Sequence, residues 1–183
     1  MTELRDYSGP YQPDLKLEDF TKEALLRLIQ LYSRFYLVID GLWYLGVKER
    51  IDNEQALTID MWAWKKMIKY QTKHLAKAMN IQGDDVATLM KLFQVDPMFG
   101  NFRYEIKLMH RNRGLFTINH CPTLEALEKE GGTRIKEICG IVDPMVFTQY
   151  AQSINPDMKV KSLKLPPRQS QEELCCQWEY CVE

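Results

Sequence analysis

The chain has 183 residues, of which 45% are hydrophobic and 27% charged, and its formal net charge is −1. Near-zero net charge without a basic stripe argues against specific nucleic-acid binding, and the longest apolar run, 35–47, contains Asp40 and is too short to cross a membrane. Five cysteines with no signal-type apolar segment before them predict a cytoplasmic protein with reduced thiols.

The first half of the chain has the pattern of helices. Residues 1–15 predict an extended arm, because Gly-Pro and Gln-Pro pairs oppose helix there. Over 18–51, apolar side chains recur at steps of three and four, which predicts an amphipathic helix or a helix pair. A second helix is expected over 54–79, with a lysine-rich face that we interpret as solvated. A short third helix is expected over 84–93, where two aspartates favour its N-terminus.

The periodicity changes to two at Pro97, where strands are expected to begin. Apolar and charged residues alternate over 102–108, which predicts a half-buried strand, and 115–120 predicts its partner after a turn. Helices should then cover 122–130, a segment capped by Thr133, and 143–154. Two further strands are expected over 158–165 and 174–182.

This order of elements predicts an α+β fold. A helical N-terminal half should be followed by a four-stranded antiparallel sheet that helices cover on one face. The length predicts a single domain over 16–183, with a helical part at 16–95 and a sheet-containing part at 96–183.

The closing strand sorts three cysteines by their parity. Side chains of a strand alternate between its faces, so Cys176 and Trp178 should face the core. Cys175 and Cys181 should then lie on the opposite, polar face. The pattern therefore predicts one shielded thiol and two accessible ones in this segment.

Two upstream cysteines, Cys121 and Cys139, lie at the ends of apolar segments. Together with Cys176 they could form a site for zinc or iron, since thiolates are soft donors and three of them leave a fourth position open. The chain has no CxxC pair, and buried cysteine is also common as a small hydrophobic residue. Both interpretations stay open on spacing alone.

Asp40 stands inside an otherwise apolar helical stretch and needs a partner if it is buried. The simple interpretation is a hydrogen bond from Tyr36 or Tyr44, which lie four residues away on either side. The alternative is a carboxylate of a ligand pocket, beside Trp43. His120, at a strand end, is the histidine that we carry forward as a pocket residue.

The second half resembles the L-2-amino-thiazoline-4-carboxylic acid hydrolase family. The resemblance is carried by Cys121 before a helix, by Cys139 and Asp143 in a Cys-x-x-x-Asp pattern, and by a terminal Cys176 before an aromatic residue. The same ending resembles 4-vinyl reductase-type ligand-binding domains, with Trp178 as the aromatic, and we expect the ligand to lie between Trp43 and Trp178. The helical half is similar to an uncharacterised group of prokaryotic cytosolic proteins with Asp-Gly-Leu-Trp.

The resemblance implies a thiol-rich pocket between sheet and helices. Ring opening would need a metal-bound water, or a thiolate nucleophile with Asp143 or His120 as proton carrier. It therefore implies catalytic roles for Cys176, Cys139 and Asp143.

Two functions from different classes follow from these patterns. The first is a small-molecule enzyme acting on C–N bonds other than peptide bonds. The second is a non-catalytic module that binds a small ligand or a metal. Both functions predict a small-molecule ligand. We expect no nucleic acid and no membrane as a partner. A homodimer stays open, as does a purely structural role.

Overall fold

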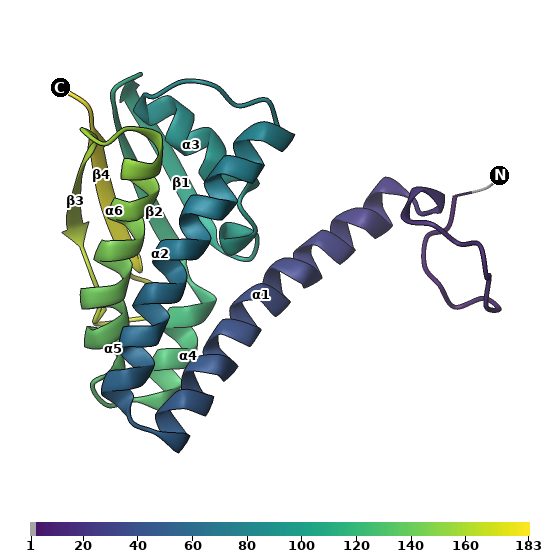
Figure 1. Ribbon diagram of the computed structural model, residues 1–183, viewed down its shortest axis with the longest axis horizontal. Coiled ribbons are helices and arrows are strands. Elements are labelled where there is room, and N and C mark those ends of the chain that lie inside the picture. The colour runs from purple at the N-terminus through teal and green to yellow at the C-terminus, as the bar shows by residue number, and fades with distance from the viewer. Residues whose placement is uncertain (1–2) are drawn as a thin grey trace.

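The computed structural model describes residues 3–183 and has an α+β fold, as the sequence predicts (Figure 1). The helical elements are η1 (Leu17–Asp19), α1 (Lys22–Arg50), α2 (Asn53–Ala78), α3 (Val86–Val95), η2 (Pro97–Phe99), α4 (Pro122–Glu130), α5 (Arg134–Glu137), η3 (Ile138–Val142) and α6 (Asp143–Ile154). The strands are β1 (Arg103–His110), β2 (Arg113–His120), β3 (Lys159–Lys164) and β4 (Cys176–Cys181).

The four strands form one antiparallel sheet in the order β1-β2-β4-β3. Helices α3 and α6 contact the sheet on one face, α2 packs on α6, and α1 packs on α2 (Figure 1). The opposite face carries Glu105, Lys107 and Lys161, which are exposed. The predicted one-sided covering of the sheet is therefore confirmed.

The segment 18–51 forms one helix and not a pair. Thr21 caps α1, because its side chain accepts a hydrogen bond from the Ala24 amide, and the helix runs without a break to Arg50. A Cβ at Gly41 would meet no atom within 4 Å, so this glycine is not a close-packing point. The N-terminal part of α1 projects away from the body of the molecule (Figure 1).

Two expectations about local structure are wrong. Thr133 stands before α5 but its hydroxyl bonds the Glu137 carboxylate at 3.2 Å and makes no capping bond. Strand β4 begins at Cys176, so Cys175 precedes it and the predicted alternation does not govern that residue. No helix among residues 3–183 combines the length and apolar character needed to cross a membrane.

Candidate functional site

A cavity of about 630 Å³ lies between α1 and α2 on one side and the sheet with α4, α5, η3 and α6 on the other. Its wall combines apolar side chains with titratable ones. The titratable residues and the arginines of its lining are Arg34, Asp40, Tyr44, Asp60, His120, Cys121, Glu125, Glu130, Arg134, Cys139, Asp143 and Cys176. Three of the five cysteines thus line one cavity, although 18 and 37 residues separate consecutive members.

Local structure positions each of these thiols. Cys121 is the N-cap of α4, and its sulfur accepts a hydrogen bond from the Leu124 amide at 3.3 Å. Cys139 lies in the π-helical turn η3, a widened turn that often marks functional positions. Cys176 opens β4, where its sulfur accepts a bond from the Trp178 indole at 3.2 Å.

The three thiols keep their protons at neutral pH. Burial raises the pKa of Cys121 to about 12, and burial with the nearby Asp143 charge raises the pKa values of Cys139 and Cys176 further. Within residues 3–183, no group of three or more His, Cys, Asp or Glu side chains is placed to hold a metal ion. The metal role of Cys121, Cys139 and Cys176 stays a prediction.

Asp143 begins α6 directly after the π-helical turn and lines the cavity beside Cys139. Burial raises its pKa to about 7, and the neighbouring Cys139 thiol offsets part of that rise. A carboxyl that titrates near neutral pH is suited to accept and return a proton. The Cys-x-x-x-Asp pattern therefore brings a protonated thiol and a potential base together.

Asp40 and Asp60 form a second acidic group on the helical side of the cavity. Burial is the main cause that raises the pKa of each carboxyl, and the charge of Asp40 further raises that of Asp60. Contacts with the Trp64 indole act in the opposite direction on both. The pair holds a proton more tightly than ordinary aspartates do.

The phenols expected for Asp40 are bonded elsewhere. The hydroxyl of Tyr36 donates to Gln71 at 2.9 Å, and that of Tyr44 donates to Asn53 at 2.9 Å. Asp40 therefore lies in the wall of a pocket, which is the second of the two positions considered from the sequence.

Arg134 supplies a positive charge to the same wall and is almost fully buried. Its guanidinium lies 3.9 Å from the Tyr44 ring centroid, and its Nη1 donates to Glu130 at 3.3 Å. Its Nε is buried and has no hydrogen-bond partner among the described residues. A buried donor without an acceptor costs free energy, so this arginine could accept an additional anionic partner.

His120 lines the cavity near the N-terminus of α4. Its Nδ1 lies 2.9 Å from a Glu125 carboxylate oxygen, and both side chains are partly exposed. The predicted pocket position of His120 agrees with this geometry, and its role stays a prediction.

Two predicted pocket residues lie outside the cavity. Trp43 is 66% exposed and does not line the cavity, because it precedes the buried Tyr44 by one residue, a step that turns its side chain about 100° around the helix towards solvent. Trp178 is buried against Phe147, with ring centroids 4.5 Å apart, and belongs to the core. Trp64 of α2 takes the aromatic position in the cavity wall.

The expectation that Cys175 is accessible is wrong, because its side chain is only 1% exposed. Its amide donates to the Ile118 carbonyl at 2.7 Å, and its sulfur lies 3.8 Å from Arg168. Arg168 pairs with Glu128 at 2.7 Å, and this pair helps to cover the thiol. Cys181 is partly exposed, as predicted.

The sequence reasoning missed Asp60 and Arg134. Asp60 could have been found from the sequence, because it lies on the same helical face as Ala56 and Trp64, four residues away on either side. An acidic residue in such a buried stripe is unusual. Arg134 had no such signal, since it follows a loop and a basic residue there is ordinary.

A family model described as a family of unknown function (DUF6125) matches residues 18–182. No curated protein and no solved structure matches significantly. The match covers both halves of the chain and every residue of the cavity, and it names no activity.

Proposed function

We propose that this chain, which belongs to the family of unknown function DUF6125, binds in its cavity a small molecule with both a cationic nitrogen group and an anionic group. The observation that carries the proposal is one cavity whose wall holds two carboxyls, Asp40 and Asp60, and a buried arginine whose Nε has no partner among residues 3–183. Its volume lies within the usual range of small-molecule sites, about 300–1,000 Å³.

Asp40 and Asp60 would hold the cationic end of such a ligand. Two carboxyls in one buried place cannot both ionise cheaply, because each charge is desolvated and repels the other. A nitrogen cation between them would remove that repulsion and satisfy both. Affinity should therefore rise as pH increases towards neutral, where the pair releases its proton.

Arg134 would hold the anionic end. Its guanidinium is planar and carries its donors in a fork that matches a carboxylate. One side of that fork is used by Glu130, and Nε remains without an acceptor among residues 3–183. Tyr44 stacks on the guanidinium and fixes its orientation.

Isothermal titration with defined probes tests this proposal. We expect L-2-aminothiazoline-4-carboxylate to bind, and its methyl ester and its analogue without the amino group to bind more weakly. Asp60→Asn and Arg134→Lys should each weaken the carboxylate about tenfold or more, which corresponds to roughly 1.4 kcal/mol. Asp157→Asn, at an exposed aspartate outside the cavity, is the matched control.

Two results would contradict the proposal. One is the absence of heat with the zwitterionic probe across pH 5 to 8, given folded protein. The other is binding that Asp60→Asn and Arg134→Lys leave at the level of the control.

Hydrolysis of the bound molecule is a second candidate, favoured by the contact between Cys139 and Asp143. Asp143 could take the thiol proton as the Cys139 sulfur attacks the ring carbon between nitrogen and sulfur, and it would give that proton to the ring nitrogen as the carbon–nitrogen bond breaks. Water would then add to the same carbon and lose a proton to Asp143. The bond from this carbon to the Cys139 sulfur would break as Asp143 returns the proton to the thiolate. This sequence needs no group that the cavity lacks.

Proton NMR of the probe distinguishes turnover from binding. If the chain is a hydrolase, ring opening should be abolished by Cys139→Ser and reduced at least a hundredfold by Asp143→Asn, while Cys181→Ser leaves it unchanged. A probe that binds and stays intact would leave the chain a binding module.

A further inference from the structure

The outer face of α1 is apolar and has no partner among the described residues. Phe35 is 54% exposed and Leu42 is 60% exposed, and the apolar side chains beside them on this face are exposed too. The more exposed apolar side chains of this face are Leu31, Tyr32, Phe35, Val38, Ile39, Leu42, Trp43 and Leu45.

The spacing of this face is that of a coiled-coil seam. Six apolar side chains follow one another at steps of three and four, which is the a/d pattern of a heptad repeat. They are Leu28, Leu31, Phe35, Val38, Leu42 and Leu45.

The opposite side of the helix packs on its own domain. Ser33 and Tyr44 are buried there, and Asp40 lines the cavity. A helix that is apolar on both sides is normally buried on both sides. The rest of the chain covers only one side of α1. The apolar spacing on the other side therefore favours contact with a second helix.

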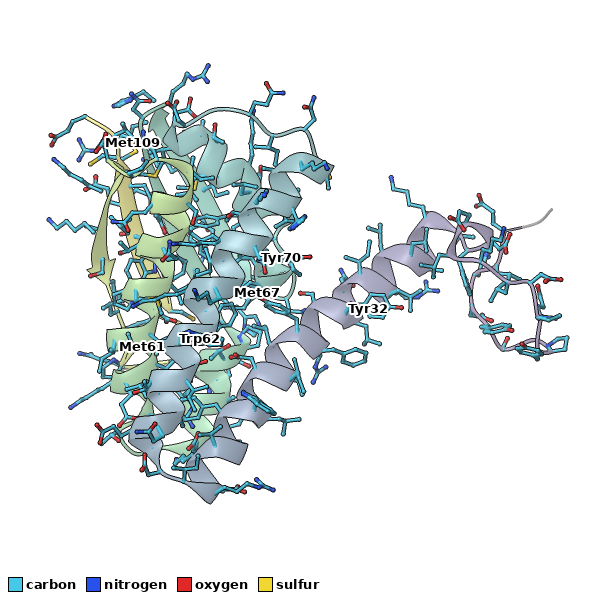
Figure 2. All side chains as sticks on the ribbon, viewed as in Figure 1. Tyr32, Met61, Trp62, Met67, Tyr70 and Met109 are labelled. Atoms are coloured by element: carbon cyan, nitrogen blue, oxygen red, sulfur yellow. The ribbon has the colours of Figure 1, made fainter. Side chains whose placement is uncertain are left out.

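Helix α2 extends this surface with Trp62, Met67 and Tyr70, which are exposed beside α1 (Figure 2). Five aromatic side chains of the two helices are more than half exposed. With the aliphatic side chains they expose on the order of 1,000 Å² of apolar surface, taking roughly 200 Å² for a whole aromatic side chain. A monomer rarely exposes more than about 600 Å² in one patch, whereas a stable interface needs about 800 Å² per partner.

We infer that the outer face of α1, with the exposed side chains of α2, binds a second copy of this chain, seam against seam. The heptad spacing calls for a helix of the same spacing, and α1 of another copy supplies one through a two-fold axis. This inference does not rest on the proposed function. Val38, Leu42 and Leu45 also line the cavity, so the partner copy would lie beside its wall.

Sedimentation equilibrium on the full chain tests the inference. We expect a mass of twice 21.6 kDa from low micromolar concentration upward. The double variant Phe35→Glu/Leu42→Glu should sediment at 21.6 kDa with an unchanged far-ultraviolet circular dichroism spectrum. Ile39→Glu, a single change on the same face, should weaken the dimer at least tenfold and covers the case in which the double variant does not fold.

Leu163→Glu is the matched control, because Leu163 is an exposed leucine of β3 away from α1, and this variant should remain dimeric. A wild-type chain that is monomeric at all concentrations would overturn the inference. So would a dimer that all three α1 substitutions leave intact, or a monomer that sediments with vesicles of phosphatidylcholine and phosphatidylglycerol through the same face.

Discussion

Two buried acidic places of this molecule differ in how their charge is satisfied. Asp96 accepts hydrogen bonds from the Met98 amide at 2.8 Å, from the Tyr150 hydroxyl at 2.9 Å and from the Gln71 side chain. Asp40 and Asp60 lie in a cavity wall, where burial raises the pKa of each carboxyl and the charge of Asp40 further raises that of Asp60. A carboxylate with three donors is part of the scaffold, whereas an acid pair that has fewer donors among residues 3–183, such as the Trp64 indole, is available to a ligand.

Their surroundings differ in the same way. Asp96 lies next to a core in which the Phe93 ring contacts the rings of Phe99, Phe116 and Tyr150 at centroid distances of 5.0, 4.7 and 5.4 Å. The acid pair faces a cavity of about 630 Å³. The packed aromatic core therefore supplies most of the stability, and the cavity wall contributes less to it.

The packed aromatic core should show the largest loss on truncation. Phe93→Ala should lower the free energy of unfolding by about 3–5 kcal/mol, because the ring is fully buried among other rings. Urea unfolding at constant pH measures it, with Leu108→Ala at an exposed site as the control, expected within about 0.5 kcal/mol of wild type. A loss for Phe93→Ala no larger than that of the control would show that this core is not the stabilising region.

The two acids should respond oppositely to neutralisation. Asp96→Asn should destabilise by about 2–3 kcal/mol, because the new amide places a donor against donors from Gln71 and Tyr150. Asp84→Asn, at an exposed aspartate, is the control. If Asp96→Asn behaved like Asp84→Asn, the hydrogen bonds of Asp96 would not stabilise the fold.

Asp60→Asn should instead stabilise the protein above neutral pH, by about 2 kcal/mol. The folded-state pKa of Asp60 is raised, so the folded chain holds more protons than the unfolded chain between roughly pH 4 and neutral, and wild-type stability falls as pH rises through that window. Asp60→Asn does not lose stability in this window. The difference in the free energy of unfolding between variant and wild type should therefore vanish near pH 4. Unfolding at a series of pH values measures the difference, and an advantage independent of pH would contradict the assignment.

The smallest effects should come from the cysteines. Cys176→Ala should cost about 1 kcal/mol through lost packing, since Cys176 is buried. In native protein, maleimide should label Cys181 fastest, while Cys175 and Cys176 react slowly and alike. Mass spectrometry of the labelled chain gives the rates, and fast labelling of Cys175 would contradict the cover that Arg168 and its loop provide.

Periodicity predicted most of the fold, since the spacing of apolar residues indicated where the helices and the strands lie along the chain. The place of Cys121 and Cys139 at the ends of apolar segments brought these two residues forward, whereas Asp143 came only from the family resemblance. Periodicity could not place Cys175, because a residue just outside a strand is covered by a loop and not by the alternation of the sheet. It could not find Arg134, because its ring partner Tyr44 lies 90 residues earlier in the chain and only the tertiary structure brings the two together.

The carboxyl carbons of Asp40 and Asp60, followed by carbon NMR across pH, test the central claim most directly. In free protein both should titrate well above the ordinary aspartate value of roughly 4, because burial raises both pKa values and the charge of Asp40 further raises that of Asp60. Saturating L-2-aminothiazoline-4-carboxylate should lower both pKa values, since its cation stabilises the ionised pair. Titration near 4 in the free protein, or pKa values that the probe leaves unmoved, would contradict the account.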